Sequence, residues 1–170
     1  MKFLDPLLAI LIAISSNPME ETTKLLGSKM DIQTTCLAQN IYHEARNEST
    51  AGMLAVANVT INRERSNAFP STICEVVYES PHYYVESTGR YIPYRHRCQF
   101  SWYCDGKSDD IKNMSRYIQI YILAEQAMQS KFDVTDGALF YHADYVDPDW
   151  NKSMTITAKI DAHIFYKPRN

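Results

Sequence analysis

The chain has 170 residues, a formal net charge of −3 and charges of both signs along its length. This length suits one domain with its own core, and the charge excludes the basic field that a nucleic-acid partner requires. The 12 Tyr, 6 Phe and 2 Trp residues are more informative. Aromatic rings stack on sugars but also fill cores, so their number alone does not separate a carbohydrate groove from ordinary packing.

The N-terminal part contains an unbroken apolar run at residues 7–14. The run is too short to span a bilayer as a helix and resembles the core of a secretory signal. A short helix docked on the domain is the alternative. Residues 19–31 are polar and unpatterned, as in a linker. We therefore expect residues 1–31 to form a hydrophobic signal or anchor segment, with transient membrane contact, followed by a linker, and residues 32–170 to form the catalytic domain.

Three helices are expected before any long extended segment. The first runs from a threonine cap at 34–35 to about Arg46, where Asn47 can adopt the left-handed conformation that ends many helices. The second begins at a cap formed by Ser49 or Thr50 and carries many small residues, which let two helices approach closely. The pair is therefore expected to form a tight helical hairpin.

The remaining segments complete an α+β pattern. We expect a short helix or turn at 71–78, a long loop at 80–97 and a third helix at 113–129. Three extended runs then follow, at residues 138–142, 154–160 and 163–166. The order predicts N-terminal helices with a small antiparallel sheet and a cleft between them. The loop carries tyrosines that could line a groove or pack on the body: Tyr83, Tyr84, Tyr91 and Tyr94.

Four cysteines, Cys36, Cys74, Cys98 and Cys104, form an even set in a chain with an export-like N-terminus. This favours two disulfides over free thiols. Our expected pairing joins Cys74 to Cys98 and Cys36 to Cys104, although the sequence leaves all three pairings open. A zinc site is less favoured, because five residues separate Cys98 from Cys104 and no matching pair follows.

Glu44 is the strongest candidate for chemistry. At helical spacing it shares a stripe with Leu37 and Ile41, so a carboxyl group stands where a core residue is expected. Such a group is costly unless it is used or paired. Apolar neighbours would raise its pKa, which suits a general acid working near neutral pH. The alternative is a structural ion pair with Arg46 or Arg63.

The histidines do not complete a recognised metal motif. His43 and Glu44 begin the His-Glu-x-x-His pattern, but Asn47 stands where the second histidine is required. His142 and His163 could join His43 at a metal, yet both lie in aromatic runs that favour packed histidines. We therefore expect no metal and no cofactor. A nucleophile elbow of the Gly-x-Ser-x-Gly type is also missing from the sequence.

Several blocks, taken together and in order, are more specific than any one motif. They are Cys36–Arg46, Gly52–Met53, Ala55–Ala57, Asn62–Arg63, Phe69–Pro70, Cys74–Tyr78, Cys98–Trp102, Cys104–Gly106, Ala138–Ala143, Pro148–Trp150 and His163–Tyr166. This series resembles the cell wall hydrolase family of spore-cortex-lytic enzymes (SleB-like). The resemblance implies a peptidoglycan-cleaving domain with a lysozyme or lytic-transglycosylase type of fold, and it makes Glu44 the match for the catalytic glutamate.

The same blocks suggest which side chains contact the substrate. We expect Gln99, Ser101, Tyr141 and His142 to bind it, while Phe100, Trp102 and Trp150 form core or groove wall. The chain departs from the family pattern at three positions. Asn47 and Asp161 stand where the family usually has glycine, and Glu79 stands where it tends to have glutamine.

The resemblance also implies a mechanism. Lytic transglycosylases use one glutamate, which protonates the leaving sugar and then takes the C6 hydroxyl proton of N-acetylmuramic acid as a 1,6-anhydro ring closes. If water attacks instead, a second carboxylate is required, and Glu48, Asp105 and Asp144 are the candidates. We therefore expect cleavage of the MurNAc–GlcNAc bond in peptidoglycan glycan strands.

Other functions stay open from the sequence. A zinc-dependent wall amidase would use the histidines, and a non-catalytic module would bind the wall without cutting it. We expect a monomer that is either exported to the bacterial envelope (periplasm or cell wall) or encoded by a phage as an endolysin acting on the host wall.

Overall fold

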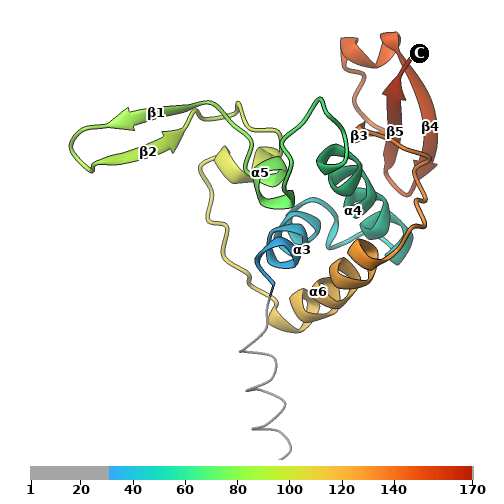
Figure 1. Ribbon diagram of the computed structural model, residues 1–170, viewed down its shortest axis with the longest axis horizontal. Coiled ribbons are helices and arrows are strands. Elements are labelled where there is room, and N and C mark those ends of the chain that lie inside the picture. Colours follow the sequence, from blue (N-terminus) through green and yellow to red (C-terminus); the bar gives the residue numbers. More distant parts are fainter. Residues whose placement is uncertain (1–30, 170) are drawn as a thin grey trace, which may run out of the picture. The chain divides into compact units, whose positions relative to one another are not determined.

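The computed structural model describes residues 31–169 (Figure 1). The predicted signal or anchor at residues 1–31 lies outside the described residues, apart from Asp31. Within residues 31–169, no helix combines the length and apolar character needed to cross a membrane.

Four helices build the larger core: α3 (Ile32–Ala45), α4 (Thr50–Glu64), α5 (Ile73–Val77) and α6 (Met114–Gln129). The predicted stripe of α3 is confirmed, because Leu37 and Ile41 are fully buried against the other helices. The helix begins before the expected threonine cap. Thr34 lies inside it, buried, and its hydroxyl donates to the Sδ atom of Met128 at 3.5 Å. Thr34 therefore packs against α6 instead of capping α3.

The start of α4 is held by residues distant in the sequence. Ser49 is the N-cap, as predicted, and its Oγ accepts from the backbone N–H of Gly52 at 3.2 Å. Asp161, in the turn between the last two strands, accepts from the Ser49 hydroxyl at 2.6 Å and from its backbone N–H at 2.9 Å. Asp161 has a φ of 48°, which explains why glycine suits this position in the family. Asn47 does not have a positive φ, so that expectation was wrong.

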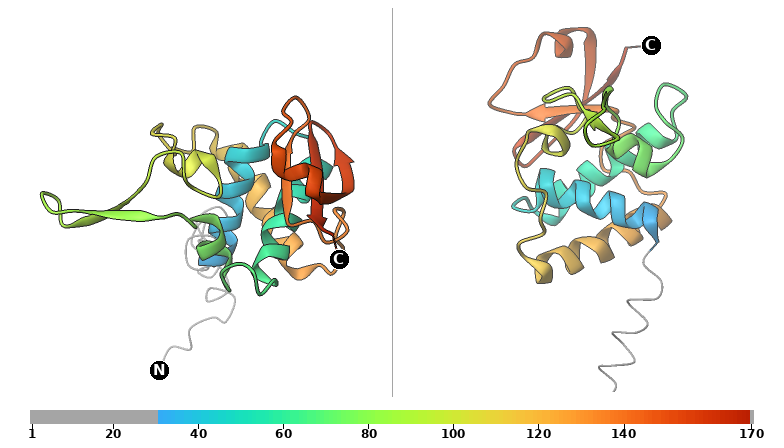
Figure 2. Two further views of the ribbon diagram at one scale, coloured as in Figure 1. Left: turned by 90° about the horizontal axis from the view of Figure 1, so that it is seen from above. Right: turned by 90° about the vertical axis from the view of Figure 1, so that its left-hand side faces the viewer.

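The expected small antiparallel sheet is confirmed. It has the order β3-β5-β4, formed by β3 (Phe140–Ala143), β4 (Met154–Ile160) and β5 (His163–Pro168). Phe165 of β5 packs with Ala55 and Val59 of α4 in a second buried cluster. Figures 1 and 2 show the sheet beside α4. Tyr141 of β3, a predicted site residue, packs against the same cluster.

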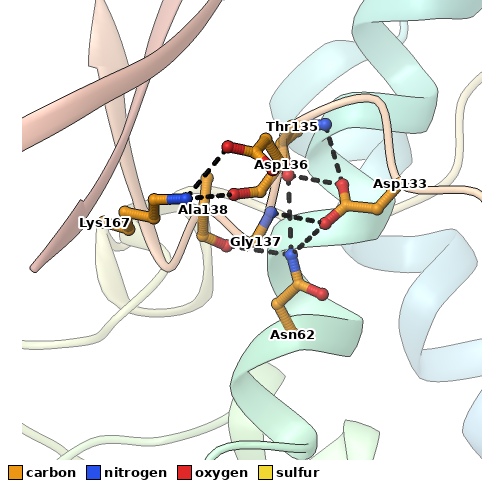
Figure 3. A network of polar contacts seen from close by, with 7 residues as sticks. All are labelled: Asn62, Asp133, Thr135, Asp136, Gly137, Ala138 and Lys167. Atoms are coloured by element: carbon orange, nitrogen blue, oxygen red, sulfur yellow. Dashed lines mark hydrogen bonds and ion pairs between the residues drawn. The ribbon is translucent and has the colours of Figure 1, made fainter.

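A polar network fixes the chain just before β3 (Figure 3). The carboxylate of Asp133 accepts from the backbone N–H groups of Thr135 and Gly137, each at 2.7 Å. Asn62 of α4 donates to Asp133 at 2.9 Å and to the carbonyl of Ala138 at 3.1 Å. These hydrogen bonds lower the pKa of Asp133 although its burial opposes the shift. The entry into β3 is thus tied to α4.

Residues 80–97 do not form the predicted loop. They contain a hairpin of β1 (His82–Val85) and β2 (Arg90–Pro93), turning near Gly89, which has a φ of 64°. The hairpin extends away from the helices (Figure 1). Apolar and aromatic residues occur on both faces of this free hairpin, so its sequence lacks the alternation typical of a strand with one buried face.

The two disulfides join Cys36 to Cys74 and Cys98 to Cys104, so the expected pairing was wrong. Helix α5 packs against α3, which brings the Cα atoms of Cys36 and Cys74 to 5.2 Å. Cys98 and Cys104 lie 6.1 Å apart around the short 3₁₀ helix η1 (Ser101–Cys104). The pairing depends on how α5 docks, which cysteine spacing does not reveal.

Asn40 forms a buried polar bridge between three elements. Its side-chain amide donates to Thr60 Oγ1 of α4 at 3.1 Å, and its carbonyl oxygen accepts from the indole N–H of Trp102 in η1 at 3.0 Å. Asn40 itself is fully buried. Because Glu44 lies one turn further along α3, this bridge fixes η1 relative to Glu44.

Replacing Asn40 by Ala is expected to lower the free energy of unfolding by about 2 kcal/mol, because a buried indole N–H loses its acceptor. Thermal denaturation should show a fall in Tm of roughly 6 °C. The exposed Asn67 provides a matched control, since Asn67→Ala should change stability by less than about 0.5 kcal/mol. An equal Tm for the Asn40 and Asn67 variants would contradict the importance of the bridge.

Candidate active site

Glu44 lies in the last turn of α3 and faces a small pocket. The pocket has a volume of about 150 Å³ and is lined by Glu44, Arg63, Gln99, Phe100, Ser101 and Tyr141. The hydroxyl of Tyr141, on β3, donates to Glu44 Oε2 at 2.9 Å. Four elements therefore meet at the carboxyl group of Glu44. They are α3, α4, β3, and η1 with the residues before it.

The environment of Glu44 favours its protonated form. Burial raises the pKa of Glu44, while the hydrogen bond from Tyr141 and the charge of Arg63 oppose that rise. None of the ion pairs found among residues 31–169 includes Glu44. Arg46 points elsewhere, since it donates to the carbonyl of Tyr42 at 3.2 Å and lies over that ring. The alternative interpretation of Glu44, a structural ion pair, is therefore not supported.

Arg63 is a site residue that sequence reasoning considered only as an ion-pair partner. It is buried, and its Nε–H donates to the carbonyl of Leu139 at 2.7 Å. Its guanidinium lies over the rings of Phe69, Phe100 and Phe140 at 5.1, 5.2 and 5.7 Å. Its buried Nη1 has no hydrogen-bond partner among the described residues. Arg63 also lines the pocket, so a positive charge lies beside Glu44.

Three of the four predicted substrate-binding residues meet at Glu44, and one does not. Gln99, Ser101 and Tyr141 line the pocket. His142 follows Tyr141 in β3, so its side chain points to the other face of the sheet. There its Nε2 lies 2.8 Å from the hydroxyl of Tyr166 and 3.2 Å from Nδ2 of Asn151. His142 therefore packs in an aromatic cluster, as its surroundings in the sequence favour.

The carboxylates proposed as a second catalytic group do not line the pocket. Asp105 pairs with Lys107 at 3.5 Å, and Asp144 pairs with Lys159 at 3.3 Å. Glu48 lies near the start of α4, where its Cβ is close to Gly52. A different acid, Glu79, acts electrostatically on Arg63 and has a buried Oε2 without a hydrogen-bond partner among the described residues. It lines a neighbouring pocket together with Gln99.

His43, His142 and His163 do not come together at one site. His43 stacks on Trp102 with ring centroids 4.4 Å apart, and burial lowers the pKa of His43. His163 contacts the Tyr141 ring edge-on at 5.3 Å, behind the pocket. Within the described part of the chain, no group of three His, Cys, Asp or Glu residues is arranged to hold a metal ion.

Replacing Tyr141 by Phe is expected to move the pH dependence of activity. A general acid acts while protonated, so if Glu44 has that role, activity is expected below its pKa and should be lost as pH rises through it. Tyr141 stabilises the carboxylate and so lowers the pKa of Glu44. Removing the Tyr141 hydroxyl should therefore move the fall of kcat/KM at high pH to a higher pH. We also expect a roughly tenfold lower rate, because the carboxylate loses a hydrogen bond. The exposed Tyr145 is the control, and an unshifted limb in Tyr141→Phe would contradict the assignment.

Comparisons with known proteins agree with this architecture. The crystal structure of the catalytic domain of the Bacillus cereus SleB protein is 25% identical and has a TM-score of 0.56, covering 82% of this chain and 94% of that one. The catalytic domain of the germination-specific lytic transglycosylase SleB from Bacillus anthracis is 24% identical, with a TM-score of 0.59, and covers 82% and 98% of the two chains. The predicted lytic-transglycosylase-like fold is confirmed.

Sequence comparisons give the family. The spore cortex-lytic enzyme of Halalkalibacterium halodurans is 36% identical over 61 residues, which are 36% of this chain and 18% of that protein. The chain therefore matches less than a fifth of that relative's length. The model of the Cell Wall Hydrolase family matches residues 47–166, beginning just after Glu44. Since this match covers most of the sequence, the chain belongs to the Cell Wall Hydrolase family.

Proposed function

We propose that this protein cleaves the MurNAc–GlcNAc bond of peptidoglycan as a lytic transglycosylase, with Glu44 as both acid and base. One observation carries the proposal. The pocket contains a carboxyl group whose pKa is raised by burial, and no second carboxylate lines the same pocket. A reaction that needs one acid suits this site better than one that needs two.

The chemistry follows from the contacts of Glu44. Protonated Glu44 donates to the glycosidic oxygen as the bond from C1 of the muramic acid to that oxygen breaks. The resulting carboxylate is stabilised by the hydroxyl of Tyr141 at 2.9 Å and by the nearby charge of Arg63. It then accepts the C6 hydroxyl proton as the C6 oxygen bonds to C1. The 1,6-anhydro ring closes, and Glu44 is protonated again.

The other pocket residues suit a substrate rich in amides and hydroxyls. Gln99 and Ser101 carry a side-chain amide and a hydroxyl that can bind acetamido or sugar hydroxyl groups. The positive charge of Arg63 lines the same pocket and suits a substrate rich in oxygen atoms. Phe100 closes the wall of the pocket. These residues would hold the sugar with its glycosidic oxygen at Glu44.

Hydrolysis is the second candidate, and Glu79 is the observation that favours it. This acid has a buried, unpartnered carboxylate oxygen and borders the pocket that shares Gln99 with the Glu44 site. If Glu79 activated water, the product would carry a new reducing end instead of an anhydro ring.

Mass spectrometry of the fragments released from purified peptidoglycan tests the proposal. A transglycosylase releases 1,6-anhydro muropeptides without new reducing ends. New reducing ends that disappear in Glu79→Gln would identify the hydrolase. Free stem peptides would indicate an amidase, and binding without release would indicate a wall-binding module. Either of these last outcomes would overturn the glycosidase assignment.

The site of action follows from the substrate. We place the protein's activity outside the cytoplasm, on the wall, as an exported enzyme or as a phage endolysin. Action as a monomer and a membrane contact through residues 1–31 remain predictions.

A further inference from the structure

The β1–β2 hairpin exposes aromatic rings that nothing in its own fold covers. Antiparallel register places Tyr83 opposite Ile92 and Tyr84 opposite Tyr91. Tyr83, Ile92 and Tyr94 therefore share one side, here termed the stem face, while Tyr84 and Tyr91 share the opposite side. Their exposed fractions range from 36% for Ile92 to 73% for Tyr91. Figure 1 and the left view of Figure 2 show the hairpin extending away from the helices.

A free two-stranded hairpin does not by itself explain why its aromatic rings are exposed. Two strands alone are marginally stable, and exposed apolar surface usually marks a binding site. Paired rings give the hairpin some order, since the centroids of Tyr83 and Tyr94 lie 4.9 Å apart and those of Tyr84 and Tyr91 lie 5.2 Å apart. Each pair also leaves ring surface open for a planar or sugar-like partner.

The base of the hairpin joins the active site. The backbone N–H of Gln99 donates to the carbonyl of Glu79 at 3.0 Å, which joins the two ends of the segment that carries the hairpin. Beside this bond lies a pocket of about 580 Å³ lined by Glu79, Ser80, Pro81, Arg97, Cys98 and Gln99. Gln99 also lines the pocket of Glu44. The two pockets thus meet at one side chain.

The stem face leads into this larger pocket. The guanidinium of Arg97 lies 5.7 Å from the centre of the Tyr94 ring. Tyr94 is held in place because its backbone N–H donates to the carbonyl of Pro81 at 3.0 Å. Contacts and pocket lining through Arg97 and Gln99 therefore connect the stem face to the pocket of Glu44. The opposite face, with Tyr84 and Tyr91, has no such connection among the described contacts.

The charge of the hairpin complements a polyanionic strand. Residues 82–97 contain Arg90, Arg95 and Arg97 but only one acid, Glu86, in a chain whose net charge is −3. Arg95 also anchors the stem, donating to the carbonyl of Asp105 at 3.1 Å next to η1. Peptidoglycan presents sugar rings together with carboxylates on its muramic acid substituents, so rings and arginines match both parts of the polymer.

We propose that the stem face binds the glycan strand beyond the bond being cut, stacking sugars on Tyr83 and Tyr94 while the arginines meet carboxylates. The proposal rests on peptidoglycan being the substrate. It makes the hairpin an extension of the substrate groove, which holds a long strand in register with Glu44.

A binding assay separates this role from catalysis. In a Glu44→Gln background, the double variant Tyr83→Ser/Tyr94→Ser should bind purified insoluble peptidoglycan about tenfold more weakly, as expected for two lost stacking contacts. The matched control Tyr84→Ser/Tyr91→Ser removes as many rings from the same hairpin and should bind within about twofold of its parent. With Glu44 restored, the ratio of kcat/KM on long strands to that on a short muropeptide should fall about tenfold in the first double variant only.

Three outcomes would overturn the proposal. The two double variants could lose binding equally, which would indicate a general loss of the hairpin, or neither could lose it. Alternatively, the stem-face variant could keep peptidoglycan binding but lose binding to vesicles of anionic phospholipid, which would make the surface a membrane contact. These outcomes differ from a failure of the proposed function. In that case the wild-type protein releases no glycan fragments, whatever its hairpin variants bind.

Discussion

Replacing Glu44 by Gln is expected to reduce the release of glycan fragments from peptidoglycan by about 10³-fold, the effect typical of losing a general acid. Gln has the same shape and keeps a carbonyl oxygen for the Tyr141 hydroxyl, which donates to Glu44 at 2.9 Å. The fold should therefore persist, while the amide has no proton to give to the leaving sugar. Chromatography with mass spectrometry measures the release, and thermal denaturation should show an unchanged or slightly higher Tm.

The matched control for this prediction is Glu48→Gln. Glu48 is also a glutamate at the turn between α3 and α4, but it does not line the Glu44 pocket. Its variant should keep wild-type activity within about threefold, in line with surface substitutions away from a site. If Glu44→Gln released fragments at the wild-type rate, or if the Glu48 variant were the inactive one, the proposed acid would be wrong.

Removing the disulfide between Cys36 and Cys74 is expected to have the largest effect on stability. These cysteines are 38 residues apart in the sequence, and opening a loop of that length should lower the free energy of unfolding by about 4 kcal/mol. The bond also ties α5 to α3, the helix that carries Glu44. Thermal denaturation of Cys36→Ser/Cys74→Ser should show a fall in Tm of roughly 10 °C.

The second disulfide is the internal comparison. Cys98 and Cys104 are only 6 positions apart in the sequence, so the same loop-entropy argument gives only about 2 kcal/mol for Cys98→Ser/Cys104→Ser. Because this bond encloses Ser101, its loss should affect glycan release more than its small effect on Tm suggests. A larger loss of stability from the short loop than from the long one would contradict the entropic explanation.

The position of Glu44 on the inward side of α3 was predictable from the sequence because the signal was local. Glu44 falls on the buried stripe with Leu37 and Ile41, and a helical period is enough to show that. The contact with Tyr141 joins residues 97 positions apart, so its geometry depends on how β3 docks on the helices. Arg63 was missed as a pocket residue for the same reason. A useful signal existed in the Asn62–Arg63 block, because an arginine within a stripe of small and apolar residues rarely lies buried without a function.

The errors have related causes. His142 directly follows Tyr141, and the block that contains both gives no indication of which one faces the pocket until the strand is paired with β5. Strand alternation allows only one of two neighbours to do so. The cysteine pairing likewise depends on the docking of α5. The pattern of residues 80–97 predicts a loop because neither face of the hairpin is buried by the rest of the fold.

The hydrogen bond from the backbone N–H of Gln99 to the carbonyl of Glu79 joins the two ends of the segment that carries the hairpin. The chain enters and leaves this segment at almost the same place, so the tip of the hairpin can change in length and composition while its base, which Arg95 ties to Asp105, stays where it is. The hairpin could therefore be replaced by another one, in evolution or by protein engineering. If the stem face binds the glycan strand as we propose, exchanging the hairpin would change which wall polymers bind while the residues around Glu44 stay the same.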